Sequence, residues 1–362
     1  MVLTVRDDDE SNPFQQLIIP MACNYKGLMH SLLALSGSHL VRVNPGNHEY
    51  QKRKEWHYTQ AISDLAKEVA LARERNKEVE DPIVASMILQ CLIPISEGST
   101  NGEYRVHLDG ARRYIKPRAD TKFGAFAWEF YKYHDMSSAV TSLHRPPTYF
   151  DDLVDDRSLP SFAVPHTIHP GDGVMVGVLD GLFKFISRIT LLRDHVRARK
   201  AQGLEPCCDY PVFDQAAEID SYLLNWQTGQ EKDTARDIAA ELYREAVLVY
   251  LRRSIRASRP DPEISERVDR GIIYLQTLPS NNSTQCILLL PLFILGCAAF
   301  EKHQRDKINI AFDHLQDYSR LGNITPARQV VGTVWEMMDA GDERSWDWET
   351  IMLDMKYDFL VT

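Results

Sequence analysis

Tyr133, His134 and Asp135 are the adjacent residues of this sequence whose side chains best suit acid–base chemistry. A histidine beside a carboxylate can exchange a proton near neutral pH, and both groups can bind a metal ion. Consecutive side chains on a helix point about 100° apart, so one of the two is expected to be buried and the other to bond a neighbour. A structural role is therefore favoured, and an acid–base role is the alternative.

Other patterns for metal or cofactor binding are missing from the sequence. His166 and His169 form a His-x-x-His pair, yet no nearby cysteine or carboxylate completes a zinc site. The six cysteines include no Cys-x-x-Cys pair. The sequence also has no Gly-x-Gly-x-x-Gly, Walker, His-Glu-x-x-His or calcium-loop pattern. We therefore predict no bound metal and no cofactor.

The elements that must position these residues are predicted to be helices, because apolar residues recur every three or four positions along the chain. The clearest stripe, which predicts an amphipathic surface helix, runs through Tyr58, Ile62, Leu65, Val69 and Ala72. Similar stripes predict an all-α protein, a single large bundle of roughly ten or more helices spanning residues 1–362. The main irregular segment is expected at residues 146–173, which are rich in proline and aspartate.

Two C-terminal stretches are unusually apolar or aromatic. Residues 286–300 are all apolar, proline or glycine, but the stretch is shorter than the ~20 residues that a helix needs to cross a bilayer. It is predicted to be a helix buried on all sides, with Pro291 kinking it or lying in its first turn and Gly296 admitting a close neighbour. The tail from Asp339 to Thr362 mixes acidic and aromatic residues, and its spacing favours a docked final helix over an activation segment.

The charge balance argues against nucleic-acid binding, and the N-terminal residues do not resemble a secretory signal. The chain carries 41 Lys and Arg against 51 Asp and Glu, a formal net charge of -10. DNA-binding domains usually present a basic surface to the phosphates. The first ten residues are acidic and lack the basic and apolar regions of a secretory signal. We expect an intracellular protein with no membrane partner and reduced cysteines.

Several stretches, taken in order, resemble the regulatory domain of fungal binuclear zinc-cluster transcription factors, the fungal-specific transcription factor domain. Each stretch is loosely defined by itself, and the ordered set is the more specific signal. The stretches cover nearly the whole chain: Asn12–Phe14, Leu28–Leu40, Tyr58–Leu65, His107–Ala111, Tyr133–Met136, Arg145–Pro147, Leu290–Ala299, Trp335 and Trp348.

The resemblance implies an all-α domain that senses signals, dimerises or represses an activation function, in transcription and with secondary metabolism as one expected context. In this family DNA is contacted by a separate N-terminal module of six cysteines, and that module is missing from this sequence. The chain is therefore expected to be the effector half of a longer factor or a standalone member whose natural start is Met1. Its expected partners are a second copy or another transcription factor, with DNA reached only indirectly or through the absent module.

The resemblance also implies a hydrophobic small-molecule ligand, because members that respond to sterols hold such a ligand in the domain. Bundles commonly bind ligands between helices. The predicted pocket combines Phe126 to Met136 with Leu292 to Cys297, where apolar bulk lies beside a polar histidine and a small glycine. Its candidate ligand-binding residues are Phe126, Phe130, Tyr133, His134, Met136, Phe293, Gly296 and Cys297.

An enzyme is the alternative function. A standalone member recruited as a cofactor-free cyclase or isomerase would act on an apolar metabolite in the same pocket. Its candidate acid–base groups are His134, Asp135 and Tyr133.

Overall fold

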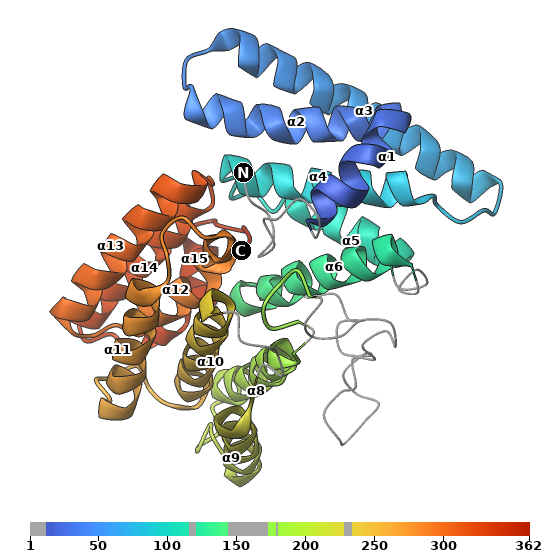
Figure 1. The fold of residues 1–362 in the computed structure, drawn as a ribbon. Coiled ribbons are helices and arrows are strands. Elements are labelled where there is room, and N and C mark those ends of the chain that lie inside the picture. The colour runs from blue at the N-terminus through green and yellow to red at the C-terminus, as the bar shows by residue number, and fades with distance from the viewer. Residues whose placement is uncertain (1–11, 116–120, 144–172, 179, 228–233) are drawn as a thin grey trace.

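The computed structural model is built of helices throughout the residues it describes (Figure 1). Within that part of the chain there are fourteen α-helices, and the sole pairing of β type is an isolated bridge between Asn101 and Asp358. The prediction of an all-α, multi-helix bundle is confirmed. The predicted irregular segment 146–173 lies outside the described residues except for Gly173. The structure describes residues 12–115, 121–143, 173–178, 180–227 and 234–362.

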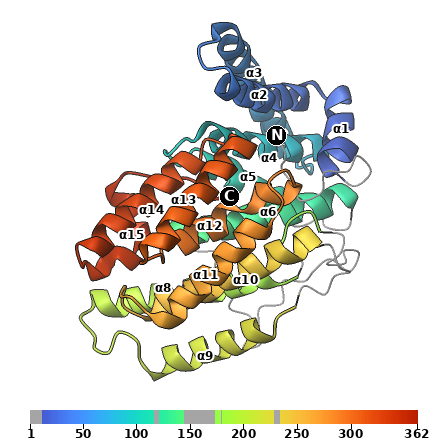
Figure 2. The ribbon, with the colours of Figure 1, turned by 60° about the vertical axis from the view of Figure 1, so that its left-hand side comes forward.

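The N-terminal helices form a hairpin at one end of the structure (Figures 1 and 2). A π-helical turn, η1 (Phe14–Ile18), and α1 (Ile19–Asn24) lead into α2 (Lys26–Val43), which packs along α3 (His48–Glu74). The side chain of Asn47 caps α3 by accepting hydrogen bonds from the next turn. In α3 only Ala61 is fully buried, so the predicted amphipathic surface helix is confirmed.

Three helices lie in the middle of the structure, and the first and last of them are almost completely buried. These are α4 (Asp81–Glu97), α5 (Tyr104–Ile115) and α6 (Lys122–Thr141). Fourteen residues of α4 and sixteen of α6 are buried. Helices that are apolar on every side belong in the interior of a large protein, and α4 and α6 accordingly contact each other inside the fold.

The next four helices complete one side of the bundle. They are α8 (Leu182–Ala201), α9 (Tyr210–Asn225), α10 (Thr234–Ile255) and α11 (Pro262–Thr277). Asp209 and Asp261 cap α9 and α11, each just before a proline in the first turn, where the missing amide hydrogen is not needed. Most residues of α10 from Ala239 to Leu251 are buried, so α10 is the centre of this layer.

The C-terminal helices pack together around a short buried helix (Figure 1). Every residue of α12 (Leu289–Gly296) is buried, and Pro291 lies in its first turn, as predicted for residues 286–300. The helix is shorter than that stretch, because η5 (Ser283–Ile287) is a separate 3₁₀ turn. Gly296 packs closely against Val331, which confirms its predicted role. Four further elements follow, namely α13 (Lys302–Ser319), α14 (Ile324–Asp339), η6 (Glu343–Trp346) and α15 (Trp348–Asp354).

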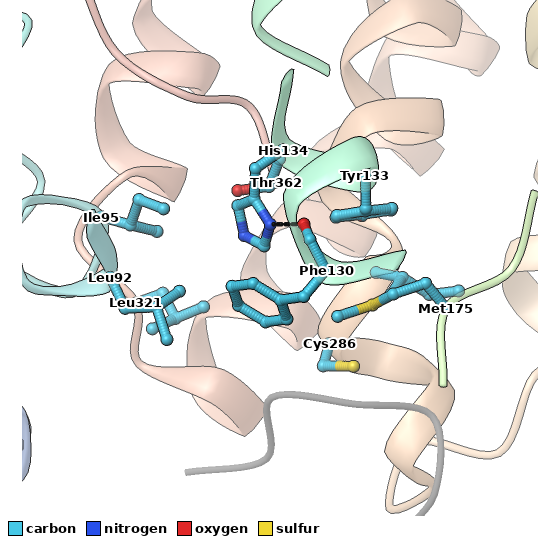
Figure 3. Close-up of a pocket in the computed structure, with 10 residues that line it drawn as sticks. Leu92, Ile95, Phe130, Tyr133, His134, Met175, Cys286, Leu321 and Thr362 are labelled. Atoms are coloured by element: carbon cyan, nitrogen blue, oxygen red, sulfur yellow. Dashed lines mark hydrogen bonds between the residues drawn. The ribbon is translucent and has the colours of Figure 1, made fainter. Parts of the chain in front are cut away.

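The C-terminal tail is docked on the core, as the spacing of its aromatic residues predicted. Trp348 is buried and its indole Nε1 donates a hydrogen bond to the carbonyl oxygen of Val140 at 2.8 Å. Phe359, Leu360 and Val361 are also buried. The tail therefore joins the end of α6 to the C-terminal helices, and this docking brings the last residues of the chain beside His134 (Figure 3).

Candidate functional site

Three of the candidate residues of α6, namely Phe130, Tyr133 and His134, border a small cavity (Figure 3). Its volume is about 30 Å³, which is room for one or two water molecules. No charged side chain is among the residues that line it. They come from α4, α6, the segment after residue 172, η5, the turn before α14 and the C-terminal end: Leu92, Ile95, Phe130, Tyr133, His134, Met175, Cys286, Ile287, Leu321 and Thr362.

His134 is the most polar side chain that lines the cavity. Its Nδ1 lies 2.8 Å from the carbonyl oxygen of Phe130 one turn earlier, so we assign the proton to Nδ1. Burial disfavours the imidazolium and lowers the pKa of His134 to about 4. The ring is therefore neutral at pH 7, with Nε2 left as a hydrogen-bond acceptor.

Tyr133 meets α10 in a buried chain of hydrogen bonds. Its hydroxyl lies 3.0 Å from the hydroxyl of Tyr243, which donates to the carbonyl oxygen of Ile287 at 2.5 Å. Because the Tyr243 hydroxyl donates its hydrogen to that carbonyl oxygen, the Tyr133 hydroxyl is the donor in the bond between the two hydroxyls. Burial raises the pKa of both phenols, so they are protonated at neutral pH. This chain ties α6 to α10 and to η5.

Asp135 faces a different environment from His134. It is half-buried, it forms a hydrogen bond with Tyr131, and it is not among the residues that line the cavity. Burial raises the pKa of its carboxyl group in spite of that bond and of nearby cations. Tyr133 and His134 thus line one cavity, whereas Asp135 lies outside it. The three acid–base candidates are therefore not assembled at one site.

The other candidate ligand residues divide into one that lines the cavity and five that do not. Phe130 lines it, and its ring packs against that of His134 with centroids 4.2 Å apart. Phe126 packs in an aromatic cluster with Phe14, and Phe293 packs edge-on against Trp348. Met136, Gly296 and Cys297 are buried elsewhere. The Gly296 carbonyl accepts the indole hydrogen of Trp335 at 2.8 Å.

Seven lining residues were not among the sequence candidates: Leu92, Ile95, Met175, Cys286, Ile287, Leu321 and Thr362. Their apolar patterns predict burial for most of them, but periodicity identifies the buried face of a helix without identifying its neighbour. Thr362 is the clearest example. Its buried hydroxyl has no hydrogen-bond partner, and only the docking of the tail brings it to the cavity.

Glu129 holds the segment that carries Met175 against α6. Its buried carboxylate accepts backbone hydrogen bonds from Val174 at 3.0 Å and from Met175 at 2.8 Å. Arg236 donates to the carbonyl oxygen of Gly173 at 2.7 Å from the side of α10. Burial outweighs these bonds and raises the pKa of Glu129 to about 7. Asp180 nearby has its pKa raised by burial to about 6.

This carboxyl group makes a specific contribution to the pH dependence of stability. Between the unfolded pKa near 4.5 and the folded pKa of about 7, the folded chain keeps a proton that the unfolded chain releases. The contribution of Glu129 to the free energy of unfolding therefore falls as pH rises, by about 2–3 kcal/mol from about pH 5 to about pH 8. His134 acts in the opposite direction, because its lowered pKa removes stability as pH falls.

Comparison with Glu129→Gln isolates the contribution of Glu129. On acidification from about pH 8 to about pH 5, we expect the free energy of unfolding of the variant, measured with urea, to rise by about 2–3 kcal/mol less than that of wild type. Glu266→Gln, which alters an exposed glutamate of α11, is the control and leaves the pH profile as in wild type. Equal pH profiles for Glu129→Gln and wild type would contradict the prediction.

Two features of the described residues limit the chemistry of the site. No group of three or more His, Cys, Asp or Glu side chains is arranged to hold a metal ion in the described part of the chain. Likewise, none of the described helices is long and apolar enough to span a membrane. The fold and the site thus define a class, a large all-α domain with a small cavity that is lined by no charged side chain and lies where distant parts of the chain meet.

The comparisons with known proteins identify the family within that class. The family model described as the fungal specific transcription factor domain matches residues 3–362. The chain therefore belongs to the fungal-specific transcription factor domain family, and the predicted resemblance is confirmed. Comparisons with curated proteins and with solved structures found no match.

Proposed function

We propose that this chain is the regulatory domain of a fungal transcription regulator and that it responds to an uncharged, hydrophobic small molecule bound at the cavity. Family membership supports the transcriptional role. The net charge of -10 supports a domain that makes no DNA contact of its own and acts through a separate module or partner. In this proposal the protein acts in the nucleus and is also present in the cytoplasm.

The observation that carries the ligand proposal is the composition of the cavity lining. Apolar side chains surround a neutral imidazole and an unpaired hydroxyl, those of His134 and Thr362. Ligand sites have this character, mostly apolar with a few placed polar groups. A charged ligand would lose its hydration there without gaining a counter-ion, so the ligand class is uncharged.

Binding requires the cavity to enlarge, because small-molecule sites usually measure about 300–1,000 Å³. Its walls belong to elements that are distant in the sequence, including α4, α6, η5 and the C-terminal end. Enlargement therefore displaces these elements relative to one another. Ligand binding would thereby change the surface of the domain. A ligand that binds only the enlarged form shifts the population towards it.

Native mass spectrometry of the protein purified from its own cells tests the ligand proposal. We expect a noncovalent adduct of an apolar compound, absent from a denatured run. Leu92→Phe, which fills the cavity from α4, should lose the adduct, whereas Leu353→Phe on the exposed side of α15 should keep it. A clean mass for wild type, or an adduct that survives Leu92→Phe in a folded protein, would contradict ligand binding at this cavity.

A protein partner is the second candidate, and the exposed apolar residues of the α2–α3 hairpin favour it. Leu33 and Leu40 lie seven residues apart on one face of α2, and both are exposed. Trp56 and Leu71 are exposed on α3. Exposed apolar side chains that form a patch are typical of a protein interface, and several such side chains lie on this hairpin. The proposed partner is a second copy or another transcription factor.

Light scattering on the purified chain tests the homodimer form of this proposal. We expect a dimer that Leu33→Glu combined with Leu40→Glu converts to a monomer. Leu224→Glu combined with Leu353→Glu, which alters exposed leucines on α9 and α15, is the matched control and keeps the dimer. A monomeric wild type would contradict the homodimer and leave the heterodimer as the partner hypothesis. That hypothesis predicts capture of a transcription factor by wild type and not by the α2 variant.

A further inference from the structure

The loop between α8 and α9 presents two neighbouring thiols. Cys207 and Cys208 are adjacent in the chain, and both are half-buried and free. The neighbouring Cys207 thiol is one of the groups that raise the pKa of Cys208. The Sγ of Cys208 also donates to the carbonyl oxygen of Ile255, at the end of α10, at 3.2 Å. Two neighbouring thiol-bearing residues are therefore partly exposed on this loop.

Arg199 fixes the loop on both sides of the pair. Its Nη2 donates to the carbonyl oxygen of Pro206 at 3.1 Å, and its Nη1 forms an ion pair with Asp209 at 3.0 Å. Asp209 also caps α9 by accepting the amide hydrogen of Val212. Burial, the neighbouring thiol and Asp209 raise the pKa of Cys208 to about 11, so it is held as a thiol. The loop that carries the pair is thus held in place by Arg199, and Cys208 is protonated.

We propose that Cys207 and Cys208 form a two-thiol binding site for trivalent arsenicals. Arsenic(III) is a soft centre, and soft centres prefer sulfur ligands. Once one sulfur has bound, the adjacent thiol closes the ring at a high effective concentration. None of the other four cysteines has a second cysteine beside it in the sequence, so an adjacent pair of thiols occurs only in this loop.

The reaction is an exchange of ligands with no change in oxidation state. With an organoarsenic oxide, two S–H bonds and the arsenic–oxygen bonds break, two arsenic–sulfur bonds form, and the two protons leave with the oxygen as one water molecule. The product no longer has the Cys208 S–H that bonds Ile255. Occupation of the site therefore releases the loop from the end of α10.

Phenylarsine oxide, added to the full reduced chain and followed by intact mass spectrometry, tests the proposal. We expect one phenylarsenic group per chain, retained in excess glutathione and removed by a dithiol, because only a dithiol competes as a chelate. Cys207→Ser and Cys208→Ser should each lower the fraction retained in glutathione at least about tenfold. Cys23→Ser, which removes an exposed cysteine of α1, should leave it unchanged.

Several outcomes would overturn the proposal. These are no glutathione-resistant adduct on wild type, an adduct that survives in both variants of the pair, or an adduct that peptide mapping assigns to another cysteine. If Cys208→Ser lost its fold with the Ile255 bond, circular dichroism would reveal it and Cys207→Ser would decide, since only Cys208 makes that bond.

Discussion

Replacing Glu349 with alanine is expected to lower the free energy of unfolding by about 3–5 kcal/mol. Glu349 and Arg193 form an ion pair in which both side chains are almost completely buried. Arg197 contacts the same carboxylate at 3.1 Å. Arg193 also donates to the carbonyl oxygen of Val140 at 3.0 Å and to the hydroxyl of Tyr250 at 2.6 Å. Removing the carboxylate leaves a guanidinium in the interior without its main counter-ion.

Urea unfolding of single and double variants measures this effect. Asp306→Ala, which removes the partner of Lys302 in an exposed pair of α13, is the control and should cost less than about 1 kcal/mol. Arg193→Met combined with Glu349→Leu should be more stable than Glu349→Ala, since no unpaired charge is left. If Glu349→Ala cost no more than Asp306→Ala, the pair would contribute nothing to holding the tail.

Gly322→Ala is the second substitution with a large expected effect, a loss of about 3 kcal/mol or more. The turn before α14 crosses the end of α4 so closely that a Cβ atom on Gly322 would lie 2.2 Å from the backbone nitrogen of Gly98. Gly322 and Asn323 donate backbone hydrogen bonds to Ser96 and Ile95 at 3.0 and 3.2 Å. Because backbone atoms occupy the space, no side-chain rotation can relieve the clash.

Gly332→Ala provides the matched control within α14. A Cβ atom there meets nothing within 4 Å, and alanine is the better helix former. We expect it to raise stability by about 0.5–1 kcal/mol, the opposite sign for the same chemical change. Thermal and urea unfolding of the two variants compare them directly. A Gly322→Ala protein as stable as wild type would refute the close crossing of these segments.

These two junctions bear on the proposed ligand response because they hold walls of the cavity in place. Gly322 follows Leu321, which lines the cavity, and the backbone bonds at Ile95 hold a second lining residue. Glu349 holds α15, and the chain beyond α15 leads to Thr362. If the cavity enlarges on ligand binding, the contacts at Gly322 and Glu349 must be distorted. The free energy of that distortion would reduce the affinity for the ligand.

The sequence by itself determined the fold class and much of the burial. The apolar spacing from Tyr58 to Ala72 predicted a surface helix, and α3 is one. The continuous apolar stretch of residues 286–300 predicted complete burial, and α12 is buried throughout. Helical periodicity is a local property, since neighbours three and four residues apart share a face whatever the rest of the chain does. The ordered set of stretches also predicted the family, and the family model matches residues 3–362.

The cavity was decided by the tertiary structure alone. Helical spacing brought Phe130, Tyr133 and His134 to one region, but Leu92 and Leu321 join them only because α4 and the turn before α14 cross there. Phe293 and Gly296, which looked equivalent in sequence, pack against other neighbours. Contacts between residues far apart in sequence depend on how whole helices pack, and a local pattern records which face is apolar without recording which partner covers it.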